Sequence, residues 1–371
     1  MKVVHVITGL GVGGAEQQLR LLLRYLPVEE AECHVVTLTN PGVVAEGIRA
    51  DGTGVTHLGM RGNRDLGAVP RLVRVIRAGG FDLVHTHLYR ACVYGRIAAR
   101  LAGVPAVVAT EHSLGDSQIE GRPLSAGTRA LYRVTERMGA GTAAVSATVA
   151  QRLRDWGVAE DRIRLVPNGI EPARFRHDPA VRAAVRERLG LSPADYAVAG
   201  VGRLVPAKRF DLLVRAAAAN PGTFLLLAGT GPERGNLLRL AADLGAADRV
   251  AVMSSEDGGP DVPGVLAAAD LFVSPSPEEA FGLAVVEALA AGLPVLYAAC
   301  PAIEDLPPCD APGASRVGGD PGKLAAAIGR QRRAGPVRLA VPAAVEHYHI
   351  AHTADRVLAL YASALASARK K

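Results

Sequence analysis

Short apolar runs alternate with amphipathic stretches along the whole chain. The first run, Val3 to Thr8, leads into a glycine-rich loop, and apolar residues then recur at helical spacing from Ala15 to Leu26. A short, continuous apolar run is typical of a strand that is buried on both faces, and such strands occur in parallel sheets joined by helices. The pattern therefore predicts an α/β protein built from repeated strand–helix units.

The predicted strands form two series, which a turn at Pro167–Ile170 separates. The chain has 371 residues, more than one hydrophobic core usually serves, so we expect two domains. We expect residues 1–168 to form the first and residues 169–349 the second, each around a doubly wound parallel sheet. The predicted strands are Val3–Thr8, Cys33–Leu38, Val55–Leu58, Phe81–His87, Val104–Thr110, Gly141–Val145 and Ile163–Val166, then Ala197–Gly202, Phe224–Ala228, Val250–Val252, Asp270–Val273 and Pro294–Ala298.

The segment from Ser274 to Gly292 combines a helix start with two acidic side chains. A short apolar strand precedes it and helical spacing begins after Gly282, so Glu279 falls in the loop and Glu287 about one turn inside the helix. The N–H groups at the start of a helix favour phosphate. One carboxylate on each side of such a site suits a molecule with a central diphosphate, such as a nucleotide sugar. Two solvated glutamates on an ordinary strand–turn–helix are the alternative.

The glycines of the first loop, Gly9, Gly11 and Gly14, match the spacing of the dinucleotide-binding fingerprint. That fingerprint also needs an acidic residue after the second strand, where this chain has Thr39 and Asn40. The missing acid argues against an NAD-dependent oxidoreductase, which stays as an alternative. We interpret the loop as backbone that approaches a ligand closely.

Histidines stand at the ends of two predicted strands. His85 and His87 share one face of their strand, and because no acid or Cys is suitably near in sequence, no metal site is predicted. His112 follows the next strand at the sheet's carboxyl edge, where ligands bind in open α/β sheets. The loop from Leu114 to Ser125 has the length of an acceptor-binding lid. Another group, near the C-terminus, is interpreted as structural: His347, His349 and His352.

The composition narrows the function classes. The net charge is +6 at pH 7, aromatic residues make up 4% of the chain, and no basic cluster is interleaved with stacking side chains, which argues against nucleic-acid binding. The Cys residues show no close paired spacing, no apolar run approaches the roughly 18 residues of a membrane helix, and the chain starts as a strand rather than as a signal peptide. We therefore expect a cytoplasmic protein.

Arginine supplies almost all of the positive charge. A lysine in the middle of the chain, Lys208, therefore indicates a position where a compact ammonium is wanted. Arginines on and just before the predicted helix from Leu66 to Ala78 form a basic patch, which suits peripheral contact with anionic lipid at the inner membrane face or with an anionic acceptor. A solvated helix face is the alternative that we favour. The patch comprises Arg61, Arg64, Arg71, Arg74 and Arg77.

Several motifs resemble those of one enzyme family in their order and spacing. They are Gly11–Glu16, Asp82–His87, Thr110–His112, Val145–Ser146, Val166–Ile170, Gly202–Leu204 with Lys208, Gly229–Glu233, and Ser274–Gly292 with Glu279 and Glu287. Along nearly its whole length the chain resembles the retaining glycosyltransferases of the GT-B fold, closest to family 4. The resemblance implies two Rossmann-like domains facing across a cleft, the first for the acceptor and the second for a nucleotide sugar. It also implies that the last helix, at about 350–371, crosses back to the first domain.

The resemblance implies roles for residues of the second domain. Arg203 and Lys208 would clamp the diphosphate, whose negative charge grows as the glycosidic bond breaks and is stabilised by fixed cations. Glu279 would hold hydroxyls of the donor sugar, and Glu287 would hold the ribose. The chain has no Asp-x-Asp motif, which agrees with a clamp that needs no metal and no cofactor. Further donor contacts are implied for Gly13, Gly14, Glu233, Phe281, Gly282 and Leu283.

The implied reaction is retaining transfer of a hexosyl or N-acetylhexosaminyl group to a hydroxyl. His112 would lie over the donor sugar, contacting a hydroxyl or supporting the charge at the anomeric carbon. The loop from Ser254 to Gly264 lacks the aromatic–Gly pair with which the family contacts the base, so a UDP-sugar is favoured on family frequency alone, with GDP-mannose next. The acceptor is either a small natural product, such as an aminocyclitol antibiotic core, or a cell-envelope glycolipid or polysaccharide. A sugar-nucleotide epimerase, a phosphorylase and a catalytically silent binding module are the alternatives.

Overall fold

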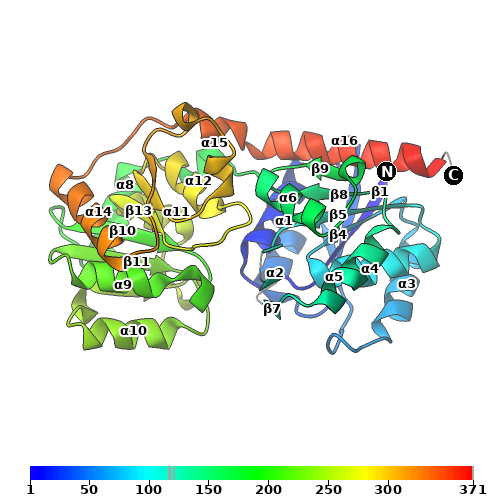
Figure 1. Ribbon diagram of the computed structural model, residues 1–371, viewed down its shortest axis with the longest axis horizontal. Coiled ribbons are helices and arrows are strands. Elements are labelled where there is room, and N and C mark those ends of the chain that lie inside the picture. The colour runs from blue at the N-terminus through cyan, green and yellow to red at the C-terminus, as the bar shows by residue number, and fades with distance from the viewer. Residues whose placement is uncertain (116–117, 120–121, 370–371) are drawn as a thin grey trace. The chain divides into compact units, whose positions relative to one another are not determined.

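The computed structural model describes residues 1–115, 118–119 and 122–369. The chain forms two units (Figure 1). One unit takes Met1–Gly169 together with the C-terminal segment from Ile350, and the other takes Ile170–His349. Each unit is an α/β fold around one parallel sheet, as the alternation of apolar and amphipathic segments predicts.

The first unit is built on a seven-stranded parallel sheet in the order β3-β2-β1-β4-β5-β8-β9. Strands β1 and β4 are neighbours, with His5 opposite His85 and Ile7 opposite His87. The central strands are buried on both faces because helices cover both, which is why they read as continuous apolar runs. The strands are β1 (Lys2–Ile7), β2 (Glu32–Thr37), β3 (Gly54–His57), β4 (Leu83–His87), β5 (Ala106–Glu111), β8 (Gly141–Ala144) and β9 (Ile163–Leu165).

The C-terminal helix completes the core of the first unit. Helix α16 (Ile350–Arg369) packs against β5 and α1 (Figure 1). Its Val357 and Tyr361 join Val3, Leu83 and Val108 of the sheet in one buried cluster. Among the described helices of the chain, none combines the length and apolar character needed to cross a bilayer. The other helices of this unit are α1 (Gly14–Tyr25), α2 (Gly42–Ala50), α3 (Ala68–Gly79), α4 (Tyr89–Ala102), α5 (Ala126–Glu136) and α6 (Ala147–Asp155).

The second unit repeats the design with a six-stranded parallel sheet in the order β12-β11-β10-β13-β14-β15. Its strands are β10 (Tyr196–Val201), β11 (Thr223–Ala228), β12 (Val250–Met253), β13 (Leu271–Ser274), β14 (Val295–Tyr297) and β15 (Ala314–Arg316). Its helices are α7 (Pro172–Phe175), α8 (Pro179–Arg188), α9 (Phe210–Ala218), α10 (Arg234–Asp243), α11 (Val262–Ala268), α12 (Leu283–Ala290), α13 (Pro301–Glu304), α14 (Pro321–Ala334) and α15 (Ala343–His347).

Both sheets reverse their winding beside their first strand. β1 lies between β2 and β4, and β10 lies between β11 and β13. In doubly wound folds the loops on the two sides of such a switch point diverge, and ligands bind at the carboxyl ends of the strands there. The loops that follow β1 and β4 in the first unit, and β10 and β13 in the second, are therefore the places to look for a site.

The structure corrects two details of the second unit. The sequence predicts a helix from Lys208 to Ala219, but Lys208 ends a short 3-10 turn, η2 (Pro206–Lys208), and α9 begins only at Phe210. The cause is Arg209, whose φ of 52° interrupts the helical path. The sequence also predicts an irregular polar loop from Ser254 to Pro263, but α11 begins at Val262 because Asp261 caps that helix by accepting a hydrogen bond from the Gly264 N–H.

One expected feature of the first unit lies partly outside the described residues. The lid expected from Leu114 to Ser125 contains two short antiparallel strands, β6 (Gln118–Ile119) and β7 (Arg122–Pro123). Residues 116–117 and 120–121 of that segment lie outside the part of the chain that the structure describes. Its function as a lid stays a prediction.

We expect Tyr361→Phe to lower the free energy of unfolding by about 1–3 kcal/mol, because the buried Nδ1 of His85 would lose its hydrogen bond to the Tyr361 hydroxyl. That bond is 2.7 Å long. Ser367→Ala is the control on the same helix, since the Ser367 hydroxyl makes only an exposed bond to Ser363. Chemical denaturation measures both variants, and an equal loss of stability in the two would contradict the role given to Tyr361.

Candidate active site

Two oppositely charged side chains meet at the carboxyl edge of the second sheet. The Nζ of Lys208 lies 2.5 Å from Oε1 of Glu279, and their side chains are only 25% and 15% exposed. Lys208 follows β10 and Glu279 follows β13, 71 positions later in the sequence. They meet because β10 and β13 are neighbours in the sheet.

Close backbone packing fixes the loop that carries Lys208. The Leu204 N–H donates to the carbonyl of Thr230 at 2.7 Å, which ties the loop after β10 to the loop after β11. A Cβ on Gly229 would come within 1.9 Å of the carbonyl oxygen of Gly202, so only glycine lets these two loops touch. The position of Lys208 therefore depends on contacts between backbones.

The N-terminus of α12 is held by the segment that follows β14. Gly282 is its N-cap with a φ of 103°, and an added Cβ would lie 2.4 Å from the Sγ of Cys300. The preceding residue, Phe281, is buried against Tyr348 with 5.0 Å between ring centroids, and its carbonyl accepts a hydrogen bond from the Ala302 N–H at 2.9 Å. The amides that begin α12 are thus fixed in place, and the helix dipole makes this end favourable for an anion.

Glu287 lies one turn inside α12 with an unusual protonation equilibrium. Burial raises the pKa of its carboxyl to about 7, and the Arg174 guanidinium acts in the opposite direction. Near neutral pH this carboxyl is therefore divided between its protonated and ionised forms. In the protonated form it can donate a hydrogen bond as well as accept one.

The other predicted residues of the second unit lie at the same edge. Arg203 is exposed on the loop after β10, and Leu283 is the first residue of α12. Glu233 ends the loop after β11, where its carboxylate accepts a hydrogen bond from the Asn236 side chain at 2.9 Å. Glu233 is thus engaged with its own helix, whereas Lys208 and Glu279 engage each other.

The first unit carries the remaining predicted residues at the carboxyl edge of its own sheet. Gly13 is the N-cap of α1 and Gly14 its first residue, both on the loop that follows β1. His112 follows β5. Burial lowers the pKa of His112 to about 4, with the Asn168 side chain acting in the opposite direction, so the imidazole is neutral near neutral pH.

The fold places His5, which the sequence analysis did not consider, beside His85 and His87, for which no metal site was predicted. His5, His85 and His87 are all buried, and one nitrogen from each lies within 4.8 Å of the others, a spacing that could hold a metal ion. Both ring nitrogens of His85 already have partners at 2.7 Å, the hydroxyls of Tyr361 and Thr110. The register of the two strands, with His5 opposite His85, is the signal that identifies the cluster, and it exists only once the strand order is known.

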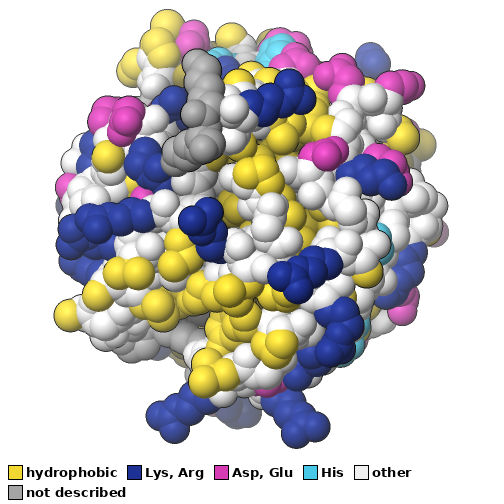
Figure 2. All heavy atoms as spheres, turned by 90° about the vertical axis from the view of Figure 1, so that its right-hand side faces the viewer, with side chains coloured by type: hydrophobic (Ala, Val, Ile, Leu, Met, Phe, Trp, Pro, Cys, Tyr) yellow, Lys and Arg dark blue, Asp and Glu magenta, His cyan; other side chains and the backbone are white. Residues whose placement is uncertain are grey.

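The arginines of the predicted basic patch differ in their surroundings. Arg71 pairs with Asp65 at 2.7 Å, and Arg77 donates to the Leu101 carbonyl at 2.7 Å. Figure 2 shows the Lys and Arg side chains of this face scattered among apolar and uncharged surface. The exposed members are Arg61, Arg64, Arg74 and Arg77. Contact with a membrane through this face stays a prediction.

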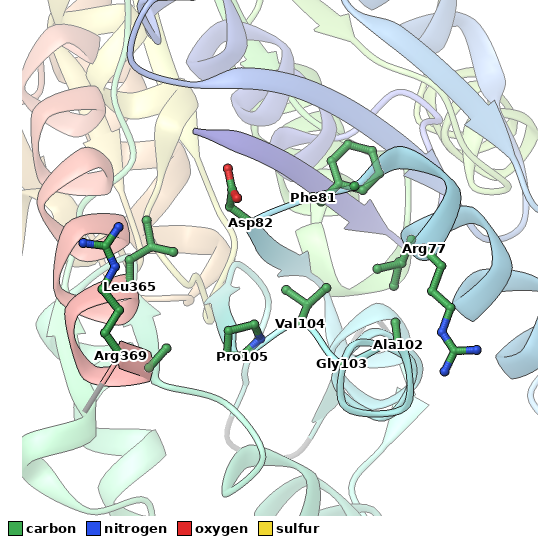
Figure 3. Close-up of a pocket in the computed structure, with 12 residues that line it drawn as sticks. Arg77, Phe81, Asp82, Ala102, Gly103, Val104, Pro105, Leu365 and Arg369 are labelled. Carbon is green, nitrogen blue, oxygen red and sulfur yellow. The ribbon is translucent and has the colours of Figure 1, made fainter. Parts of the chain in front are cut away.

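A pocket of about 420 Å³ lies at the opposite edge of the first sheet (Figure 3). Its lining includes Asp82 and Pro105, which precede β4 and β5, and Leu365 and Arg369 of α16. The pocket therefore lies at the amino ends of the strands. The loops that carry the predicted site residues lie at the other ends, so this pocket does not belong to the candidate site.

Comparison with known proteins decides the family. Residues 12–174 match the model of glycosyltransferase family 4, and residues 181–328 match that of the glycosyl transferases group 1. A D-inositol 3-phosphate glycosyltransferase of Acidothermus cellulolyticus is 36% identical over 330 residues, which cover 81% of this chain and 71% of that protein. The chain belongs to the group 1 glycosyltransferases of family 4.

Further similarities agree with this glycosyltransferase assignment. D-inositol 3-phosphate glycosyltransferase 1 of Catenulispora acidiphila is 32% identical over 354 residues, 86% of this chain and 83% of that protein. The structure of HepE from Anabaena in complex with UDP and glucose has a TM-score of 0.83 at 21% identity, covering 96% of this chain and 98% of that one. The structure of sucrose-phosphate synthase from Thermosynechococcus elongatus has a TM-score of 0.73 at 22% identity, and the match covers 100% of this chain and 98% of that one. These neighbours show that this glycosyltransferase has the GT-B fold.

We expect Glu287 to make a contribution to the free energy of unfolding of this glycosyltransferase that falls as the pH rises through about 7, and we expect Glu287→Gln to remove that contribution. The pKa of Glu287 is raised from 4.5 to about 7, so between these values the folded state holds more protons than the unfolded state. The stabilisation is complete below pH 4.5 and is lost as the pH rises through the folded-state pKa. It amounts to about 3 kcal/mol at most.

Urea denaturation at a series of pH values measures this effect. The difference in the free energy of unfolding between the two proteins should change over the interval from about 4.5 to about 7 and stay constant above it. Parallel curves for the original chain and Glu287→Gln would contradict the raised pKa.

Proposed function

We propose that this glycosyltransferase moves a hexosyl or N-acetylhexosaminyl group from a nucleotide sugar to an acceptor hydroxyl, with retention of the anomeric configuration and without a metal ion. A UDP-sugar is the favoured donor, and GDP-mannose is next. The observation that carries the proposal is the half-buried ion pair of Lys208 and Glu279 at the switch point of the second sheet. The N-terminus of α12 follows Glu279 on the same loop.

The second unit offers each part of a nucleotide sugar a chemically suitable partner. A diphosphate against the amides that begin α12 has Lys208 and Arg203 on the neighbouring loop as counter-charges. Glu279 can accept hydrogen bonds from sugar hydroxyls, and Glu287 can bond the ribose hydroxyls. As the glycosidic bond breaks, negative charge grows on the diphosphate, and cations that are already in place stabilise it without reorganisation.

In the first unit we propose that His112 contacts a hydroxyl of the donor sugar. Gly13 and Gly14 bring their backbone amides close to the donor phosphate or to the acceptor. Transfer proceeds by front-face attack. The bond from the anomeric carbon to the phosphate oxygen breaks, a bond to the acceptor oxygen forms, and the leaving phosphate oxygen takes the acceptor's proton. This route needs no side chain as general base.

The names of two relatives support a choice of the first acceptor to test. The two relatives described above are both named D-inositol 3-phosphate glycosyltransferases. We therefore propose a phosphorylated cyclitol as the first acceptor to test, ahead of an aminocyclitol or a cell-envelope saccharide. Arg61 and Arg64 follow β3 at the carboxyl edge of the first sheet and are exposed, so they can contact an acceptor phosphate.

We expect Lys208→Ala and Glu279→Ala each to lower kcat by at least about a hundredfold, because each removes a group that acts on the developing charge or on the sugar. Lys323→Ala is the matched control, since Lys323 is an exposed lysine of the same unit. Initial rates with a saturating donor measure the effect, and circular dichroism checks the fold. Full activity in either site variant would contradict the proposal.

We expect one class of nucleotide sugar to raise the melting temperature, because a ligand that binds only the folded chain stabilises it by mass action. The panel holds UDP-glucose, UDP-N-acetylglucosamine, GDP-mannose and NAD⁺. A shift with NAD⁺ alone would favour the oxidoreductase alternative. The donor that binds is then incubated with inositol 3-phosphate, with inositol or with no acceptor, and product formed without acceptor would favour an epimerase.

A further inference from the structure

Three histidines of the first unit form a hydrogen-bonded row that ends at His112. The Nδ1 of His5 lies 3.0 Å from the Nε2 of His87, and the Nδ1 of His87 lies 3.1 Å from the Nε2 of His112. Neighbouring rings are nearly parallel, with interplanar angles of 18° and 26°. We call His5, His87 and His112 the histidine row. It leads from the middle of β1 to the loop after β5.

The members of the row are neutral near neutral pH. Burial lowers the pKa of His5 to about 3, that of His87 well below its usual range and that of His112 to about 4. A neutral imidazole has one N–H, which donates, and one bare nitrogen, which accepts. His87 bonds to a neighbour at each nitrogen, so it donates to one neighbour and accepts from the other.

The protons of the three rings can therefore be placed in only two ways. In the first, every ring carries its proton on Nδ1, so that His5 donates to His87 and His87 donates to His112. In the second, every ring carries its proton on Nε2 and the direction of donation is reversed. The two differ at the ends of the row. The first presents an N–H at Nδ1 of His112, and the second presents an N–H at Nε2 of His5.

The ends of the row favour the first arrangement. Among the described residues, neither the Nε2 of His5 nor the Nδ1 of His112 makes a hydrogen bond of standard geometry, although both atoms are buried. An unpaired buried N–H costs about 1–3 kcal/mol and is rarer in proteins than an acceptor that lacks a donor. At His5 that N–H would sit in the core, whereas at His112 it lies beside the Asn168 side chain and at the edge where ligands bind.

We propose that His87 and His5 are positioning residues that hold His112 in its Nδ1–H tautomer, so that His112 presents a hydrogen-bond donor at the carboxyl edge of the first sheet. The proposal deepens the role of His112 and rests on the proposed function. A donor at this place suits a sugar hydroxyl oxygen or a phosphate oxygen. In the reversed arrangement the Nδ1 of His112 carries no proton, so it would present only a lone pair, which cannot donate a hydrogen bond to these oxygens.

His85 provides the matched control within the same cluster. Its ring centroid lies 4.1 Å from that of His87, but its nitrogens bond to the hydroxyls of Tyr361 and Thr110 and so stand outside the row. Replacement of His85, like replacement of His87, removes a buried ring and two hydrogen bonds. It leaves the protons of the row unchanged.

The test reads the tautomers directly from the full chain, without substrate. Long-range ¹H–¹⁵N correlation spectra of the ¹⁵N-histidine-labelled protein distinguish a protonated from a bare ring nitrogen, and single His→Gln variants assign the signals. We expect His5, His87 and His112 all to carry the proton on Nδ1. Protons on Nε2 in all three, or an even mixture, would overturn the proposal. Because no substrate is present, this result stands apart from the success or failure of the proposed function.

Variants at His87 then test the control over His112. His87→Asn keeps an N–H near the place of Nδ1 and should keep His112 as the Nδ1–H tautomer, whereas His87→Leu should let His112 become mixed or change to Nε2–H. With donor and acceptor present, kcat should be about tenfold lower in His87→Leu than in the original chain and largely restored in His87→Asn. The KM for the acceptor should be unchanged in both variants. His85→Leu should leave His112 as Nδ1–H. If His112 lost its Nδ1–H tautomer in His85→Leu as well, the proposal would be overturned. It would also be overturned if the purified chain held one equivalent of zinc whose removal shifted the His87 signals.

Discussion

Parallel strand pairing is the constraint on which the rest of this structure depends. Because all strands of a sheet run in one direction, the loops that follow them collect at one edge. Lys208 and Glu279 meet at that edge although 71 positions separate them in sequence. In the first sheet the same constraint brings the glycine loop after β1, His87 at the end of β4 and His112 after β5 to one edge.

Each of the two units shows how this protein accommodates ionisable groups that have little contact with water. Lys208 and Glu279 form an ion pair in which each side chain is half-buried, and a polyanionic ligand together with sugar hydroxyls could replace each partner. The pKa of Glu287 is raised instead, so that this carboxyl spends part of its time neutral. In the first unit, the lowered pKa values keep the imidazoles of the histidine row neutral near neutral pH. Hydrogen bonds between the rings, rather than ion pairs, hold this row together.

Glycine provides the close contacts that hold the site together. Gly229 lets two loops touch through their backbones, and Gly282 lets α12 begin directly against Cys300. Contacts of this kind leave the backbone amides near the loop surface, where a phosphate can approach them. Gly229 and Gly282 also belong to the motifs by which the chain resembles group 1 glycosyltransferases of family 4. The need for close backbone contact therefore explains why these two motif positions hold glycine.

The sequence by itself determined the two parallel-sheet units and the loops that carry the chemistry, because apolar runs, helical spacing and glycine positions are local signals. It placed Lys208, Glu279 and His112 at strand ends for the same reason. Only the tertiary structure decided that Lys208 sits in a turn, since the left-handed backbone of Arg209 leaves no trace in the pattern of apolar positions. Only the tertiary structure could add His5 to the histidines, because His87 is 82 positions away from it and strand order alone makes them neighbours.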